Sequence, residues 1–377
     1  MKLFAAHRDD AHEADGEALL HRRAAFAAAV VLFLVVTMPL EAALLPFHVA
    51  LDVILESQSL HELLSSISGK FASSSREELE QLAVGSFVIP LKKLGFILSV
   101  SVLLFLGFRN IKRAPWLWFG WRARLGKAAL LSLLIACLVL PLKLRSLGDL
   151  YARMSLSPFD EPFGLIYRRA LMPALANTLG LSGYLLYLLF SVALTVLLVY
   201  LVLTYFEKNG TRLSSVTILS LLTSSFVMYG FEMPGYSDQL AMIFLLLMLL
   251  LPPSMHARLS LVALSLATHE ASVLMILPVT AFFFTRREQN STFKLIGVYA
   301  FLVLAGTQFD VGRLLTAHAF FDATGFSPWD YIVRNPTAAL VGIAVAYKLF
   351  WIVTATAAVR ALKGGEPTVA RTIIACT

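Results

Sequence analysis

Long apolar stretches recur along almost the whole chain, separated by short polar segments. The longer stretches cover residues 24–45, 85–108, 128–142, 183–205 and 338–359, and the shorter ones cover 214–229, 239–251, 259–268, 271–284 and 293–309. A helix needs about 20 apolar residues to cross a bilayer. The pattern therefore predicts an all-α, polytopic membrane helix bundle with about 9–10 transmembrane or half-crossing helices.

The shorter stretches gather in the second half of the chain. Short or broken helices are tolerated at membrane depth where they are buried in protein or line a cavity. We therefore expect the second half to form an outward-facing cleft rather than a plain bundle.

Composition agrees with a membrane protein. The 377 residues are 58% hydrophobic and only 15% charged, whereas a soluble domain carries about 25% charged residues. The net charge of +7 comes from basic residues that flank apolar stretches, as the positive-inside rule describes. Membrane lipids are thus expected partners, and nucleic acid is not.

Basic residues also predict the orientation. Arg22 and Arg23 precede the first apolar stretch, and residues 109–127 contain six basic residues and no acid. Because cytoplasmic loops are enriched in Lys and Arg, both chain termini and the 109–127 loop are expected in the cytoplasm. The chain is then an integral, multi-pass protein, with the bacterial cytoplasmic membrane as its expected location.

Two segments refine this topology. Residues 46–93 would lie outside, and apolar positions at helical spacing within them predict an amphipathic helix on the outer membrane surface. Residues 259–284 form either one span or a hairpin that turns at Thr268, His269 and Glu270. Charge favours the hairpin, because it places the basic residues at 286–287 on the cytoplasmic side.

In this topology, four polar segments meet at the outer face, namely 157–169, 231–238, 268–270 and 321–331. The first holds Asp160 and Glu161, which fit a catalytic carboxylate or a solvated turn before a helix. It also holds Arg168 and Arg169, which fit phosphate binding or interfacial anchoring.

The next two segments supply further candidates. Asp238 fits a catalytic acid or a first-turn acid of its helix, and Glu232 and Tyr236 precede it as substrate-binding candidates. His269 and Glu270 interrupt apolar sequence. They fit a functional pair, because ionisable groups at membrane depth are costly, or a salt-bridged turn.

Three polar landmarks resemble those of the GT-C-type membrane glycosyltransferases, especially small bacterial members. They are "DEPFGLIYRRALMPALANTLG" (160–180), "GYSDQLAMIFLLLMLLL" (235–251) and "ATHEASVLMILP" (267–278). The resemblance covers residues 126–359. The family places its key acid in the first outer loop, and residues 46–93 offer no clear counterpart, so the first two spans are treated as an N-terminal addition.

The resemblance implies a transferase that moves a sugar from a polyprenyl-phosphate-linked donor to a lipid or glycan acceptor at the outer membrane face. Asp160, Glu161 or Asp238 would act as the catalytic carboxylate. Arg168 and Arg169, helped by His269, would hold the phosphate, and Glu270, Glu232 and Tyr236 would contact substrate. No metal ligand set is evident, and a divalent cation as cofactor remains open.

A single integral domain is expected over residues 1–377. It comprises a two-span addition (1–125), a GT-C-like core (126–359) and a cytoplasmic tail (360–377). Two alternatives remain: a transporter or flippase of a polar or lipid-linked substrate, built like broken-helix transporters, and a polysaccharide polymerase or ligase. No G-x-x-x-x-G-K-[ST] or H-E-x-x-H motif is present, which argues against a built-in ATPase or zinc protease.

Overall fold

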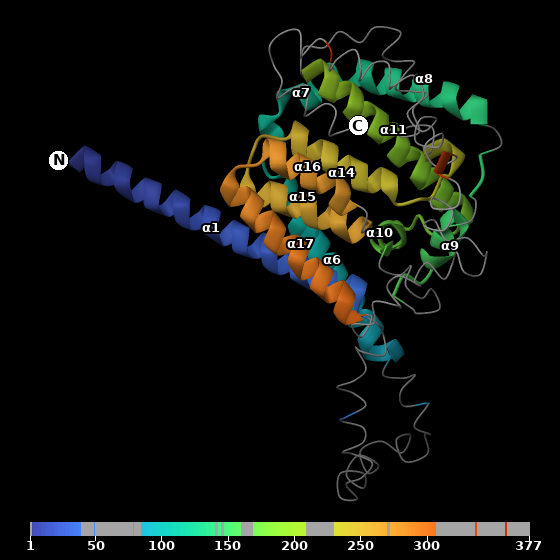
Figure 1. Ribbon diagram of the computed structural model, residues 1–377, viewed down its shortest axis with the longest axis horizontal. Coiled ribbons are helices and arrows are strands. Elements are labelled where there is room, and N and C mark those ends of the chain that lie inside the picture. Colours follow the sequence, from blue (N-terminus) through green and yellow to red (C-terminus); the bar gives the residue numbers. More distant parts are fainter. Residues whose placement is uncertain are drawn as a thin grey trace, which may run out of the picture.

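Every regular element in the described part of the chain is helical (Figure 1). The structure is a computed structural model that describes residues 2–38, 49, 78, 84–139, 142–144, 147–159, 169–208, 230–269, 272–306, 336–337 and 359. The all-α class expected from the apolar pattern is confirmed for these residues.

Among the described residues, three helices are long and apolar enough to cross a membrane, by length and composition. The segments are Gly16–Thr37 within α1 (Lys2–Thr37), Val84–Arg113, which contains α6 (Ile89–Phe108), and Tyr184–Lys208, which is α11. They overlap the predicted stretches 24–45, 85–108 and 183–205, although the first begins at residue 16 rather than at residue 24. Two shorter apolar helices are also present, α14 (Asp238–Leu250) and α16 (Ser272–Phe283).

The remaining elements are shorter or more polar. They are η1 (Val84–Val88), η2 (Ile111–Arg113), α7 (Pro115–Trp118), α8 (Trp121–Val139), α9 (Leu147–Met154), α10 (Leu171–Thr178), α15 (Met255–Thr268) and α17 (Arg286–Gly306). Predicted features at 46–83, 214–229, 338–358 and 360–377 lie outside the described residues, apart from the two positions 49 and 78.

Helix α15 forms the centre of the bundle. It packs against α1, α6, α14, α16 and α17, and all of its residues from Leu259 to Thr268 are buried. Since α15 is surrounded on all sides, even its serines at 260 and 265 are fully buried. The Ser260 hydroxyl donates a hydrogen bond to a backbone carbonyl within α15, and the Ser265 hydroxyl donates to a backbone carbonyl of α14. The central position of α15 fixes where both of its ends lie.

Basic residues gather at one end of the bundle, which we call the basic end. Here Arg109, after α6, contacts Glu17 and His21 of α1, and His21 lies beside His256 of α15. The C-terminus of α11 meets that of α14, because Lys208 Nζ donates to the Leu249 carbonyl at 2.8 Å. Helix α17 also begins at this end.

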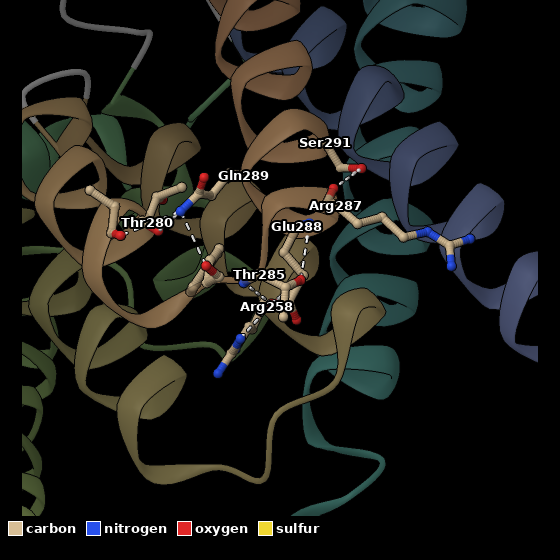
Figure 2. A network of polar contacts seen from close by, with 9 residues as sticks. Arg258, Thr280, Thr285, Arg287, Glu288, Gln289 and Ser291 are labelled. Atoms are coloured by element: carbon tan, nitrogen blue, oxygen red, sulfur yellow. Dashed lines mark hydrogen bonds and ion pairs between the residues drawn. The ribbon is translucent and has the colours of Figure 1, made fainter.

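The ends of α15 and α17 are joined there by a buried ion pair (Figure 2). Arg258 Nη1 lies 2.6 Å from Glu288 Oε2. The Thr285 amide donates to the Glu288 carboxylate and the Glu288 amide donates to Thr285 Oγ1, which together form the capping box of α17. Gln289 donates to three backbone carbonyls at the C-terminal end of α16. The α16–α17 connection is therefore fixed beside the start of α15.

The helical structure is interrupted at His269, between α15 and α16. His269 has extended backbone (φ −158°, ψ 128°), and its amide closes the last turn of α15. The two helices pack against each other, and Ser272 Oγ donates to the Ser265 carbonyl at 3.0 Å. Residues 259–284 are thus two helices rather than one span, and α17 starts at the basic end, as the hairpin interpretation requires.

One expectation was wrong in detail. Residues 109–127 were predicted as a loop, yet they contain η2, α7 and the start of α8. Arg124 is buried within α8. Its burial is tolerated because its guanidinium group donates to Thr204 Oγ1 at 2.8 Å and pairs with Glu207 at 3.0 Å. A charged side chain that is paired in this way can lie within a helix, so the basic residues here do not mark a loop.

Candidate functional site

Asp238 and His269 meet at the end of the bundle opposite to the basic end. Asp238 is the first residue of α14, and His269 follows the last residue of α15. Asp238 Oδ1 and His269 Nε2 are 3.7 Å apart, and their side chains are 37% and 13% exposed. Since α14 and α15 pack along their lengths, this separation is fixed by the bundle.

Side-chain contacts link Arg169 to Tyr236, which precedes Asp238 by two residues. The ring of Tyr236, two residues before Asp238, lies edge-on to the ring of Tyr151 with centroids 6.5 Å apart. Arg169 Nη1 in turn donates to Tyr151 Oη at 3.4 Å. Tyr151 belongs to α9, and Arg169 lies just before α10. We call Tyr151, Arg169, Tyr236, Asp238 and His269 the Asp238 cluster.

The turn that precedes Asp238 is held by α11. Gly235 has φ +94°, a conformation that glycine adopts readily and other residues rarely do. Its amide donates to Ser191 Oγ at 2.6 Å, and Tyr187 Oη donates to its carbonyl at 3.0 Å. Both partners are buried. These two hydrogen bonds hold the backbone turn before Tyr236 and Asp238 against α11.

Helix α9 reaches the same turn through a backbone contact at Gly148. A Cβ atom built on Gly148 would lie 2.3 Å from the Pro234 carbonyl oxygen, and one on Gly235 would lie 3.0 Å from Gly148 Cα. No side chain fits between the two segments. This close approach brings Tyr151, one turn further along α9, next to Tyr236.

Asp238 does not serve as the cap of its helix. Ser237 occupies the N-cap position, and no side chain caps the helix there. Asp238 lies in the first turn of α14, where a negative charge interacts favourably with the helix dipole. Its carboxylate also has a partner at the end of another helix, because His269 follows α15. The capping interpretation of Asp238 therefore explains only part of its environment.

The other predicted residues are placed as follows. Glu232 is exposed on the approach to the turn and belongs to none of these contacts. Asp160, Glu161, Arg168 and Glu270 lie outside the described residues. Of the nine candidates, Arg169, Tyr236, Asp238 and His269 are thus found together.

Two residues of this region were not identified as candidates from the sequence. Tyr151 is fully buried in α9 and lies outside the polar segments from which the candidates were taken. Gln239, beside Asp238, is 2% exposed, and neither its amide nitrogen nor its amide oxygen has a hydrogen-bond partner. A buried amide without partners costs free energy, and nothing in the local sequence signals it.

The described residues do not assemble a metal site. No group of three or more His, Cys, Asp or Glu side chains converges among them. Asp238 and His269 are two side chains of metal-binding type that lie beside each other, which is fewer than a metal site needs.

The comparisons with known proteins give no relative. No family model matches the chain, no curated protein matches it, and no solved structure matches it.

The arrangement suits an anionic, polar ligand. Arg presents several donors in a planar fork that matches phosphate oxygens, and the partly exposed carboxylate of Asp238 offers an acceptor for a hydroxyl group. His269 holds this carboxylate from one side. Together they provide a cation, an acid–base pair and two aromatic rings at one end of an apolar bundle.

Proposed function

We propose that this chain is a membrane glycosyltransferase that moves a sugar from a polyprenyl-phosphate-linked donor to a lipid or glycan acceptor. The observation that carries the proposal is that two contact groups lie on one turn: Arg169 contacts Tyr151, which packs on Tyr236, and Asp238, two residues after Tyr236, lies beside His269. An arginine suited to phosphate and a carboxylate–histidine pair thus lie toward the same end of a bundle with three candidate spans among the described residues.

The proposed topology places the basic end in the cytoplasm and the Asp238 cluster at the outer face. Arg22, Arg109, Arg124 and Arg258 all lie toward the basic end, as the positive-inside rule favours. The short helices α14 and α16 then complete a polytopic bundle of about 9–10 crossing or half-crossing helices around an outward-facing cleft. A donor sugar at that face must be lipid-borne, because nucleotide sugars are made in the cytoplasm.

In the proposed reaction, a carboxylate removes the proton of the acceptor hydroxyl as this oxygen bonds to the anomeric carbon. The bond from that carbon to the phosphate oxygen breaks, and polyprenyl phosphate leaves with the bonding electron pair. Arg169 stabilises the charge that develops on the leaving phosphate. We assign this proton transfer to Asp238, with Asp160 and Glu161 as the other candidates from the sequence.

The test is release of polyprenyl phosphate. Purified protein in nanodiscs is given undecaprenyl phosphate linked to different hexoses and pentoses, together with lipid and glycan acceptors, and the freed lipid phosphate is measured by mass spectrometry. We expect release with at least one donor, reduced about 100-fold or more by Asp238→Asn and strongly by Arg169→Gln.

Helix α9 supplies matched controls. Asp149 and Arg153 form a surface ion pair near the same end of the bundle, and Asp149→Asn and Arg153→Gln make the same chemical changes outside the cluster. They should retain activity. Transport of a polar solute into proteoliposomes, with no donor cleaved, would instead favour the transporter alternative.

A further inference from the structure

A second polar site lies at the basic end, far along the bundle from the Asp238 cluster. A pocket of about 330 Å³ is formed where α1, α15 and α17 meet, and α1 and α17 run side by side there (Figure 1). Its polar lining consists of Arg22, Arg23, Lys294 and Ser291, and it contains no acidic residue. Three positive charges therefore face one small space.

These cations differ from the largely buried ones at the same end. Arg124 pairs with Glu207, and Arg258 pairs with Glu288. In the described structure, no carboxylate pairs with the pocket's two arginines or its lysine. Because like charges in one pocket repel each other, an anion bound among them would lower the electrostatic free energy.

The rest of the pocket wall is apolar. Phe26 and Ala27 come from α1, and Leu259 comes from α15. Ala27 and Val31 lie one turn apart on α1 and are both exposed, so an apolar strip continues from the pocket toward the middle of the candidate span. A small free anion would leave this strip in contact with water or lipid.

Helix α17 continues the opposite side of this strip. Gly297 and Phe301 follow Lys294 by three and seven residues, which places them on the same helix face. Both are exposed, and a Cβ atom built on Gly297 would meet nothing within 4 Å. The space beside Gly297 is open to an acyl chain.

Ser291 adds a hydroxyl group to the wall. Figure 2 shows Ser291 on the α17 turn above the capping box, where its hydroxyl donates to the Arg287 carbonyl at 3.1 Å. Its oxygen lone pairs remain available to a protonated headgroup hydroxyl. Cations, a hydroxyl and an adjoining apolar strip together match the parts of a phosphate-bearing lipid.

We propose that this pocket binds the headgroup of an anionic phospholipid, with Arg22, Arg23 and Lys294 holding its phosphate. One acyl chain lies along the strip between α1 and α17. Basic pockets between helices at the cytoplasmic side of a membrane bind such headgroups. The lipid would stabilise the contact between α1, which precedes the core, and the core helices α15 and α17.

Native mass spectrometry of the detergent-purified full chain tests this proposal, with phosphatidylglycerol and phosphatidylcholine as probes. We expect phosphatidylglycerol to be retained in preference to phosphatidylcholine. The variant Arg22→Gln/Arg23→Gln/Lys294→Gln should bind phosphatidylglycerol about ten-fold or more weakly. The control Lys112→Gln/Arg113→Gln/Arg122→Gln removes three charges at the same end but outside the pocket, and it should bind as the wild type does.

Two further arms separate a lipid from a free anion and from misfolding. Gly297→Leu fills the chain path and favours the helix, so it should weaken lipid binding while leaving thermal stability in lipid-free detergent at least as high. Equal lipid binding by both triple variants would overturn the proposal. So would complete displacement of phosphatidylglycerol by millimolar inorganic phosphate, because the site would then recognise a free anion.

Discussion

His269 Nε2 lies 3.7 Å from Asp238 Oδ1, across the junction between the start of α14 and the end of α15. The pair lies at the end of the bundle opposite to the basic end. Among the described residues, no other acid and histidine from two different helix ends lie together there. Both side chains keep some exposure, so the pair is accessible to a ligand.

The first prediction separates function from stability at this pair. An exposed or half-exposed ion pair contributes about 0–1 kcal/mol, so Asp238→Asn should change the free energy of unfolding by less than about 1 kcal/mol. Its catalytic effect should be about 100-fold or more. Thermal unfolding and donor cleavage are measured on the same preparation. Loss of both in proportion would assign Asp238 a structural role.

The second prediction concerns the contact of Gly148 with the Pro234–Gly235 turn. A methyl group at Gly148 would lie 2.3 Å from a backbone oxygen, so Gly148→Ala should destabilise the fold by about 1–3 kcal/mol or more. It should also displace Tyr151 from Tyr236. The unfolding midpoint in detergent measures the first effect.

Gly126 provides the matched control for that substitution. It lies within α8, and a Cβ atom there meets nothing within 4 Å. Gly126→Ala should therefore raise stability by about 0.5–1 kcal/mol, because alanine favours the helix. Equal effects at both positions would show that α9 and the turn are not in close contact.

The third prediction concerns the buried Arg258–Glu288 pair. Glu288→Gln keeps an acceptor for the capping box but leaves the Arg258 charge without its counterion, at a cost of about 3 kcal/mol. The double variant Arg258→Met/Glu288→Gln removes that uncompensated charge and should regain much of the lost stability. A double variant that is less stable than Glu288→Gln would contradict this account of the pair.

The fourth prediction is a pH dependence at His256, which lies at the basic end and outside the three candidate spans. Burial lowers the pKa of His256 below its ordinary value of 6.5, and the nearby His21 and Arg109 lower it further, against a smaller opposing effect of Glu17. The folded protein therefore binds this proton less readily than the unfolded chain. Stability should be unaffected above pH 6.5 and should decrease as the pH falls below it.

The measurement is the unfolding midpoint of wild type and His256→Gln between pH 8 and pH 5. The variant lacks the titrating group, so its advantage over the wild type should grow as the pH falls below 6.5. A difference that stays constant over this range would exclude the effect.

Local sequence predicted the helices better than their packing. The apolar stretch 183–205 became α11 (Tyr184–Lys208), because a helix satisfies every backbone group in an apolar environment. Tyr151 was overlooked because its burial depends on the approach of Gly148 to Pro234, 86 residues away along the chain (234 − 148). The helical start of α8 was missed for a similar reason, since Arg124 is neutralised by partners on α11.

The placement of Asp238 and His269 at the same end of the bundle could be predicted, because helix ends follow from apolar patterning. Because the turn at His269 and the turn before Asp238 each end an apolar stretch, alternation along the bundle places them at one end. The contact between Arg169 and Tyr151 depends instead on how α9 and α10 pack, and no periodicity in the sequence encodes that packing.

The most direct test of the central claim is a structure of the protein in nanodiscs with undecaprenyl phosphate bound. The account predicts the phosphate within hydrogen-bonding distance of Arg169, with Asp238 and His269 bordering the same space. A phosphate bound elsewhere, or a polar path through the bundle with no phosphate at Arg169, would contradict it.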